Sequence, residues 1–458
     1  MVECSRHSLT PPTSHLTPAV QEMGYPHKSH PRETPVLSKH FGDAEARTLD
    51  GWKARGGYKA LAQALHMDPV AIQEIVKASG LRGRGGAGFP TGLKWSFMRI
   101  GDGKPHYLCC NADESEPGTF KDREIMRWTP HALIEGCAVT ALAIGAETSY
   151  IYIRGEFTEP IVVMERALAE ARAAGIIGKN AMGSGKTIDV WVHKGAGAYI
   201  CGEETALMNS LEGKRGNPRI KPPFPAVSGL FGKPTTINNV ETLAAVPHIL
   251  NNGAEWYKAM CLSSPKSTGS KLYSVCGNVA KPGNYEVVMG FSFKEFLYDL
   301  CGGPLPGRKF KALIPGGSSV PTITIAEAEE IKMDYEGFVA QGTMLGSGGV
   351  IIFDDAQSMP RQLARIARFY AHESCAQCTQ CREGTAWMTK ILERIVAGQG
   401  TYEDLDTIFD LSEQMTGKTI CVLSDSCGAP VVSGITKFRS EFEALIKGKR
   451  SSTVAVGA

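Results

Sequence analysis

The sequence predicts an α/β protein that carries two further units, a small α+β domain and a C-terminal four-helix bundle. In residues 107–192, short apolar segments typical of buried strands alternate with helix-length segments, which is the order of an α/β domain. Residues 271–355 change to short β-rich runs between Gly and Pro turns, a pattern typical of a separate small domain. From residue 361 onward the pattern is helical, which favours a bundle.

The composition limits the possible function classes. The chain has 458 residues, of which 43% are hydrophobic and 21% charged, as in ordinary globular proteins. A formal net charge of +2 provides no basic field for nucleic acid or anionic lipid. The 13 cysteines are scattered through the chain, so they favour free thiols in a reducing compartment over a disulfide scaffold.

No membrane-spanning segment is expected, because no run reaches the ~18 apolar residues that a spanning helix needs. The first residues contain no apolar signal core and little arginine, which disfavours secretion and a mitochondrial presequence. If the protein acts at a membrane, other proteins must hold it there. Residues 1–35 are rich in Pro, His, Ser and Thr, and we expect them to form a flexible arm that need not pack.

The α/β domain is expected to span residues 36–265. Asp68 and Pro69 suit the N-cap and first turn of a helix over residues 68–79. The other expected helices lie at 57–61, 130–146 and 159–174, after residue 204 and after residue 238, and the expected strands at 107–110, 150–154 and 188–192.

The two smaller units follow in order. The α+β domain is expected over residues 266–356, with strands at 272–275, 285–288, 322–325 and 350–353 and one helix at 292–301. The helical unit is expected over residues 357–448, with helices at 361–372, 384–395, 402–415 and 437–446, before a tail at 449–458.

The glycine-rich segment 80–95 is the first candidate site. It matches the pattern G-x-G-x-x-G at Gly83, Gly85 and Gly88. The dinucleotide-binding fingerprint follows a strand, whereas the segment before this one is helical, so a standard Rossmann assignment is rejected. Clustered glycines still let backbone N–H groups approach phosphate oxygens, and Arg84 and Lys94 add positive charge. A flexible surface loop is the alternative.

An acidic segment follows the first expected strand. Asn111, Asp113, Glu114 and Glu116 come directly after residues 107–110. Because α/β sheets bind ligands at the carboxyl ends of their strands, this segment predicts a site.

Two further motifs resemble nucleotide sites. Residues 183–187 read Gly-Ser-Gly-Lys-Thr, but Asn180 stands where a P-loop needs glycine, and a strand follows instead of a helix. The turn at 195–204 does lead into a helix start, which suits an anion. Glu203 and Glu204 in that first turn also suit the helix dipole, and helix capping is the alternative for Asn238 and Asn239.

The last motif is a group of three cysteines. Cys375, Cys378 and Cys381 form C-x2-C-x2-C, a spacing typical of iron–sulfur ligands, of which four are usual. The fourth must come from farther along the chain, where Cys421 and Cys427 are the only cysteines. A zinc site is the alternative, although zinc sites usually pair two C-x2-C units and there is no second one here.

Together, these motifs make the chain resemble a known family, the NADH-binding, flavin-carrying 51 kDa subunits of respiratory NADH:quinone oxidoreductase, complex I. The resemblance covers about residue 36 to about residue 447. It is carried by the segments 80–95, 111–121, 195–207, 238–243 and 374–384.

The resemblance implies a Rossmann-like but non-standard FMN- and NADH-binding α/β domain, a β-grasp-like α+β domain, and a bundle that carries a [4Fe–4S] cluster. The FMN pocket is expected to be lined by Gly83, Arg84, Gly85, Lys94, Asn111, Asp113, Gly202, Glu203, Glu204, Asn238, Asn239 and Thr242. NADH is expected to contact Phe89, Phe97, Glu116, Lys221 and Phe224. The implied cluster ligands are Cys375, Cys378, Cys381 and Cys421, with Cys427 as an alternative ligand or a nearby free thiol.

The implied activity is that of an NADH dehydrogenase, translocase type, in the respiratory chain. FMN takes hydride from NADH, and electrons leave singly through the cluster toward quinone. Glu116 is assigned to orienting the nicotinamide. The implied partners are a small [2Fe–2S] thioredoxin-like subunit and a large multi-cluster iron–sulfur subunit, on the cytoplasmic side of a bacterial inner membrane.

Two other functions are compatible with the same motifs. Similar modules serve as diaphorase subunits of soluble NAD-linked hydrogenases and formate dehydrogenases, which often carry additional iron–sulfur domains. A non-enzymatic structural protein could keep the fold and lose the site. The glycine-rich loop, the acidic segment and the four cysteines argue against that second alternative.

Overall fold

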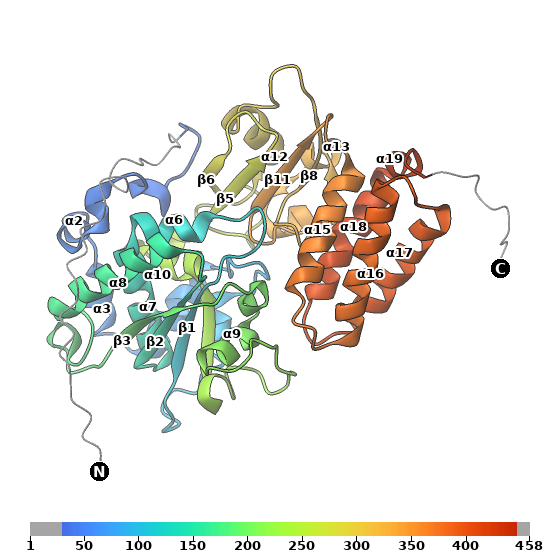
Figure 1. Cartoon of the computed structure of the whole chain (residues 1–458). Helices are drawn as coiled ribbons and strands as arrows, with labels where there is room; N and C mark the ends of the chain where they lie inside the picture. Colours follow the sequence, from blue (N-terminus) through green and yellow to red (C-terminus); the bar gives the residue numbers. More distant parts are fainter. Residues whose placement is uncertain (1–29, 447–458) are drawn as a thin grey trace, which may run out of the picture.

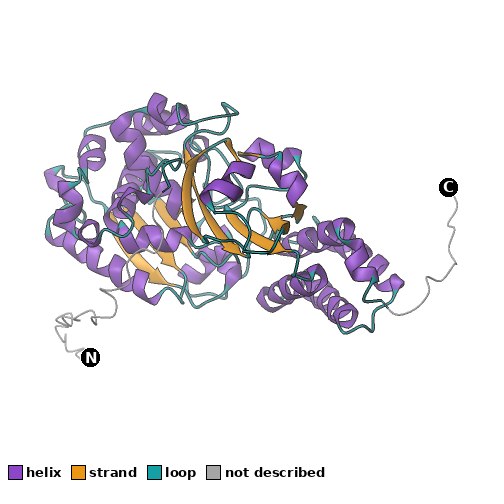
Figure 2. Cartoon of the chain, turned by 90° about the horizontal axis from the view of Figure 1, so that it is seen from above, coloured by secondary structure: helices purple, strands orange, loops and turns teal. Residues whose placement is uncertain are grey.

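The computed structural model describes residues 30–446. Figure 1 shows three neighbouring parts in chain order: an α/β domain in blue to green, a small domain in gold, and a helical bundle in orange to red. Seen from above in Figure 2, the strands of the first two parts lie among helices, and the bundle projects to one side. The arrangement is the predicted fold class.

The α/β domain is built on a parallel four-stranded sheet. Its strands are β1 (Tyr107–Ala112), β2 (Thr148–Ile153), β3 (Asp189–Lys194) and β4 (Thr235–Asn239). Their order across the sheet is β3-β2-β1-β4, with every pairing parallel. The chain therefore adds β2 and β3 on one side of β1 and β4 on the other, which makes a topological switch point between β1 and β4.

Helices cover this sheet. The most deeply buried is α7 (Pro130–Ile144), which is largely apolar and has 14 of its residues in the interior. It packs against α10 (Val240–Asn252) through Gly136, where an added Cβ would lie 2.1 Å from the Leu243 carbonyl oxygen. The remaining helices are α2 (Leu49–Ala54), α3 (Lys59–Ala64), α4 (Pro69–Ser79), α5 (Thr91–Trp95), α6 (Lys121–Trp128), α8 (Thr158–Ala173), α9 (Glu204–Leu211) and α11 (Ala254–Lys258).

Three predictions made from short motifs in this domain are confirmed. Asp68 caps α4 by accepting a hydrogen bond from the backbone N–H of Val70. A helix precedes the glycine-rich loop and a strand follows residues 183–187, so the standard Rossmann and P-loop assignments are both correctly rejected.

The small domain has a mixed five-stranded sheet. Its order is β6-β5-β11-β8-β9, formed by β5 (Ser270–Gly277), β6 (Gly283–Val288), β8 (Phe310–Ile314), β9 (Ile323–Thr324) and β11 (Gly349–Asp354). A separate antiparallel pair joins β7 (Phe291–Ser292) to β10 (Lys332–Met333).

The prediction of one helix in this domain is wrong. The expected helix forms as α12 (Phe293–Glu295) and a π-helical turn (Phe296–Leu300), but α13 (Ile325–Glu329) and α14 (Tyr335–Ala340) are also present. Both are too short for helical periodicity to reveal them. Thr324 is the N-cap of α13, and its side chain forms a capping box with Glu327.

The bundle has four main helices, but one of them was predicted wrongly. α15 (Met359–Glu373), α16 (Thr379–Val396) and α17 (Tyr402–Met415) match the prediction, whereas the fourth helix is α18 (Leu423–Lys437). Only the short α19 (Arg439–Glu443) lies where the fourth was expected.

The reason lies in the composition of α18. Gly428, Pro430 and Gly434 are poor helix formers in isolation. In the bundle, the glycines allow close packing: an added Cβ would lie 2.5 Å from Ser412 Oγ of α17 at one position and 2.3 Å from Leu363 of α15 at the other. Packing therefore overrides propensity.

The end of the N-terminal arm packs, contrary to prediction. Arg32 pairs with Glu295 and Asp299 of the small domain, and the Thr34 N–H donates to the Glu286 carbonyl oxygen. The buried Glu286 carboxylate also accepts the backbone N–H groups of Val36, Leu37 and Ser38. The remainder of the arm and the C-terminal tail lie outside the described residues.

Within residues 30–446, none of the helices combines the length and the hydrophobicity that crossing a membrane requires.

Candidate functional site

The predicted flavin residues gather at the carboxyl edge of the parallel sheet, on both sides of the switch point. Asn111 is the next-to-last residue of β1 and donates to the Gly202 carbonyl oxygen at 2.8 Å, which joins β1 to the turn before α9. Asn238 on β4 accepts from Trp95 Nε1 at 2.9 Å. The segments are thus brought together at the position where α/β sheets bind ligands.

The glycine-rich loop lies over the end of β4. The Arg84 backbone N–H donates to Thr242 Oγ1 at 2.8 Å, and the Gly83 carbonyl accepts from the Tyr335 hydroxyl at 2.9 Å. A Cβ at Gly85 would lie 3.0 Å from Asn239 Cβ. A larger residue at Gly85 would therefore lift the loop from the sheet edge.

The Arg84 side chain, which was predicted to add positive charge to the loop, is buried. It is 1% exposed, and its guanidinium donates to the Thr268 carbonyl oxygen and the Tyr257 hydroxyl at 2.8 and 3.0 Å. These contacts fasten the loop to the start of the small domain. Lys94 is the cation that the loop segment does present to the sheet edge.

Two lysines and two glutamates form a network at the start of α9. Lys94 contacts Glu204 at 3.3 Å, and Lys221 contacts Glu204 and Glu203 at 2.7 and 3.2 Å. Burial acts to raise the pKa of Glu204, but the two lysines outweigh it and lower that pKa. Glu203 is also the N-cap of α9, so the helix-dipole alternative is confirmed for that residue.

At the centre of this region, one carboxylate oxygen of Asp113 is buried without a hydrogen-bond partner. Its Oδ1 accepts from Ser115 Oγ at 3.0 Å, while its Oδ2 is buried without a hydrogen-bond partner. Burial raises the pKa of this carboxyl to about 7. A buried polar atom without a partner is costly, so this oxygen fits a site that a polar cofactor group completes, such as a ribityl hydroxyl of FMN.

Glu116 lies where the three parts of the protein meet. Its carboxylate accepts from the Tyr199 hydroxyl at 2.7 Å and the Ser319 N–H at 2.8 Å, and Tyr370 of α15 approaches to 3.5 Å. Burial raises its pKa, and these donors partly offset the rise. Tyr199 was missed by the sequence reasoning, although it stands inside the 195–204 turn that was singled out.

A buried ion cluster supports Asn239. Asn239 caps α10 through the Glu241 N–H, as the capping alternative predicted, and donates from Nδ2 to Asp122 at 2.6 Å. Glu241 contacts both Lys121 Nζ at 2.8 Å and Lys271 Nζ at 2.7 Å. No local signal distinguished these charges, because they meet only in the folded chain.

Exposed aromatic rings border the same region. Phe89 and Phe97 are 45% and 50% exposed, and their ring centroids lie 6.2 Å apart. Phe224 is 60% exposed and lies three residues after Lys221. Exposed rings of this kind suit stacking on a planar base.

The cysteines come together at the start of α16. Cys378 Sγ accepts from the Ile420 N–H at 3.4 Å, which links the C-x2-C-x2-C segment to the residue before Cys421. The pKa of Cys421 is raised to about 12 by burial, with further contributions from Cys381 and Cys375, as expected for neighbouring thiols. Cys427 is instead enclosed in the bundle, with Sγ 3.8 Å from Met388 Sδ.

Within residues 30–446, no three His, Cys, Asp or Glu side chains converge as a single-ion site would require. Each thiolate of a four-iron cluster binds a different iron, so cluster ligands need not converge on one point. The four-cysteine ligand set therefore remains a prediction.

Two family models match the chain. The "Nuo51 FMN-binding domain" matches residues 76–248, and the "NADH-ubiquinone oxidoreductase-F iron-sulfur binding region" matches residues 361–445. The first covers the sheet-edge residues and the second covers the four cysteines, so the second favours iron–sulfur over zinc.

Curated relatives match along most of the chain. It is 52% identical to the second F-type subunit of NADH-quinone oxidoreductase from Rhizobium meliloti, over 91% of this chain and 98% of the relative. It is 50% identical to the F-type subunit of the same enzyme from Mycobacterium tuberculosis, over 91% of this chain and 94% of the relative.

Solved structures also match. An H2-reduced NAD+-reducing [NiFe]-hydrogenase chain aligns with TM-score 0.75 and 38% identity over 84% of this chain. This chain spans only 64% of that hydrogenase chain. The air-oxidised form aligns with TM-score 0.78 and 36% identity over 92% of this chain and 69% of that one.

Proposed function

We infer the function from the family to which the chain belongs, that of the F-type subunits of NADH-quinone oxidoreductase. The chain is the NADH dehydrogenase subunit of complex I, and its cofactors are FMN and a [4Fe–4S] cluster. The observation that carries this assignment is the match of two separate family models to two separate regions, together with identity near 50% over nine-tenths of the chain.

FMN, when bound, accepts two electrons as hydride from NADH and releases them singly to the cluster toward quinone. Hydride transfer needs no protein acid or base, so the protein contributes binding, orientation and electrostatics. Residues of the sheet edge are proposed to do this for FMN, with Asp113 Oδ2 as the unsatisfied acceptor and Lys94 as the cation beside Glu204.

The exposed rings Phe89, Phe97 and Phe224 are proposed to stack on NADH, and Lys221 to lie beside it. Glu116 is proposed to orient the nicotinamide. Its carboxylate is held in place by Tyr199 and Ser319, so its position is fixed before the substrate arrives, as orientation requires.

The cluster is proposed to bind Cys375, Cys378, Cys381 and Cys421. The Ile420 N–H contact to Cys378 Sγ supports Cys421 as the distal ligand. The burial of Cys427 against Met388 supports a free thiol.

The partners are other complex I subunits. The specific partners proposed are a small [2Fe–2S] thioredoxin-like subunit and a large multi-cluster iron–sulfur subunit. The proposed location is peripheral, on the cytoplasmic side of a bacterial inner membrane.

A hydrogenase diaphorase subunit is the second candidate, favoured by the solved structures that match. Sequence identity favours complex I, because the chain is 52% identical to the Rhizobium meliloti relative but 38% identical to the hydrogenase chain.

An absorbance spectrum of the anaerobically purified chain, before and after NADH, tests the assignment. Flavin bands near ~450 nm over a broad iron–sulfur shoulder, both bleaching with NADH, are expected. An iron–sulfur shoulder without flavin bands would support the cluster but not the NADH site. A colourless chain containing zinc would overturn the assignment, provided that cofactor loss during purification were excluded.

A further inference from the structure

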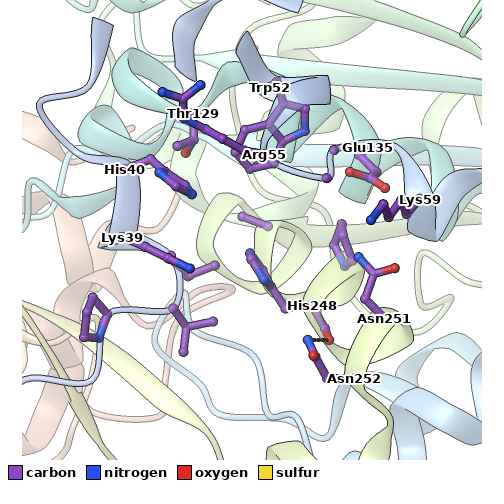
Figure 3. Close-up of a pocket in the computed structure, with 18 of the residues that line it drawn as sticks. Lys39, His40, Trp52, Arg55, Lys59, Thr129, Glu135, His248, Asn251 and Asn252 are labelled. Carbon is purple, nitrogen blue, oxygen red and sulfur yellow. Dashed lines mark hydrogen bonds between the residues drawn. The ribbon is translucent and has the colours of Figure 1, made fainter. Parts of the chain in front are cut away.

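A cavity of about 520 Å³ lies among the segment at residues 35–59, α7, α10 and Trp256 of α11. Its volume is in the range of small-molecule sites. None of the residues assigned above to FMN, NADH or the cluster lines it. Figure 3 shows side chains gathered around one space, with Lys39 and His40 from the segment before α2, Trp52 from α2, Lys59 from α3, and His248 and Asn251 from α10.

The cavity is lined by an excess of basic side chains. Lys39, Lys59 and Arg55 carry positive charge, and His40 and His248 add two imidazoles. Glu135 is the only acidic residue among the lining residues. Its carboxylate accepts the backbone N–H groups of Tyr58 at 2.8 Å and Leu61 at 3.2 Å, and within the described residues it makes no ion pair with either lysine.

The cations that line the cavity differ in whether a carboxylate of the chain pairs with them. Arg55 is committed, because its Nε donates to Asp43 Oδ2 at 2.9 Å. Neither Lys39 nor Lys59 makes an ion pair with any residue of the described part of the chain. The pKa of His248 is lowered to about 4, first by burial and then by the charges of His40 and Lys39. Lys39 and Lys59 are therefore the unpaired positive charges of the cavity, because Arg55 is paired and burial lowers the pKa values of His40 and His248.

The cavity also offers apolar and hydrogen-bonding surface. Trp52 and Trp256 line it, and Trp52 is 7% exposed. The Trp52 indole N–H is near enough to Glu135 to lower the pKa of that carboxyl, but it makes no hydrogen bond of good geometry. A buried N–H without an acceptor favours an occupant that supplies one.

We propose that this cavity is a second ligand site, which binds an oxyanionic small molecule with an aromatic or other apolar body. The oxyanion lies beside Lys39 and His248, the body packs on Trp52 and Trp256, and Lys59 adds positive charge from the opposite side of the cavity. Oxyanions suit this site because lysine ammonium groups and N–H donors pair with them directly. A phosphate ester and a polycarboxylate share this chemistry, and the experiment distinguishes them.

The test is isothermal titration calorimetry on the full chain with its cofactors bound, at constant ionic strength. The probes are pyrophosphate, citrate and AMP, with adenosine as the uncharged match of AMP. We expect saturable binding of AMP with a stronger affinity than adenosine. Preference for pyrophosphate over citrate would identify phosphate as the source, and the reverse would identify a carboxylate.

AMP could also enter the proposed NADH site, so the location needs its own variants. Lys39→Glu combined with Lys59→Glu should weaken the binding of the oxyanions by about tenfold or more, since two charges reverse. Lys104→Glu is the matched control, because Lys104 is exposed and does not line the cavity. Both lysines are exposed, so the variants should keep the melting temperature of the parent.

Two results would overturn the proposal. One is the absence of measurable binding of every oxyanion to the parent chain. The other is binding that the double variant leaves unchanged, or that Lys104→Glu weakens equally. If the double variant failed to fold, Trp52→Phe, which removes the N–H and keeps a ring, would take its place and should weaken the same binding.

Discussion

The sheet edge and the cysteine end of the bundle are built in opposite ways. At the sheet edge, nearly every polar side chain already has a partner in the chain, as in the contacts of Lys94, Glu204 and Lys221. At the bundle, the four thiols have few donors, of which the Ile420 N–H to Cys378 is one. The first region is organised by the protein's own side chains, whereas the second depends on the group that would join its ligands.

This difference has a physical cause. Carboxylates and ammonium groups pair with each other in a folded chain, so a cofactor site made of them can be preformed. Thiols are weak hydrogen-bonding groups, and thiolates bind iron far better than they bind one another. The sheet edge should therefore tolerate loss of its cofactor, while the cysteine end should depend on its cluster.

The largest expected effect is the loss of the cluster in Cys421→Ser. Iron content should fall from about four per chain toward zero, while FMN remains bound because the sheet edge does not depend on the cysteines. Iron analysis and the absorbance spectrum measure both. Cys427→Ala is the matched control, since Cys427 packs against Met388, and it should keep its iron. Equal loss of iron in Cys427→Ala would make Cys427 a ligand.

The next effect concerns the ion cluster beneath the sheet edge. Glu241→Gln leaves Lys121 and Lys271 buried without their shared carboxylate, and should lower the free energy of unfolding by about 3–5 kcal/mol. Urea denaturation measures it. Glu255→Gln, which breaks an exposed pair with Lys258, is the control and should cost at most about 1 kcal/mol.

The lowered pKa of Glu241 predicts that the stability of the fold depends on pH. Burial acts to raise the pKa of Glu241, but Lys121 and Lys271 outweigh it and lower the pKa to about 2. A folded pKa below the unfolded value stabilises the fold above the unfolded pKa, and this stability is lost as pH falls through about 2. Glu241→Gln should remove this part of the acid sensitivity, and an unchanged acid profile would contradict the assignment.

Asp113→Asn is expected to raise the free energy of unfolding, by less than Glu241→Gln lowers it. Burial raises the Asp113 pKa to about 7, so the fold loses stability as pH rises from the unfolded pKa of about 4 to about 7, and the loss is constant above that value. The flavin-free variant should be more stable than the parent by about 2–4 kcal/mol near pH 8, and equal to it near pH 4.

FMN binding should weaken in Asp113→Asn, because an amide replaces the unpaired acceptor. Urea denaturation at the two pH values and flavin titration measure the two effects separately. Asp50→Asn, an exposed position on α2, controls for the change of charge. If the variant gains stability but binds FMN as tightly as the parent, Asp113 does not contact FMN.

The smallest expected effect is kinetic. Glu116→Gln replaces a charged acceptor for Tyr199 and Ser319, and should slow flavin reduction by NADH about tenfold to hundredfold, while FMN stays bound. Stopped-flow absorbance measures the rate. Tyr199→Phe removes one donor only and should have a smaller effect. The role is refuted if NADH affinity and reduction rate are both unchanged in Glu116→Gln.

Local pattern alone determined much of this protein. The fold class, the glycine-rich loop, the acidic strand end and the cysteine spacing are all short-range features, set by residues within about twenty positions of one another. The capping role of Asp68 was also predicted correctly, because a helix cap depends on its immediate neighbours.

Only the tertiary structure decided how side chains are shared between the three parts. Arg84 bonds to Tyr257 and Thr268, and Lys271 meets Glu241, through contacts between residues far apart in the sequence. The fourth bundle helix is α18 because Gly428 and Gly434 admit neighbouring side chains. Sequence propensity describes a residue in isolation, whereas burial and long-range pairing set its energy in the fold.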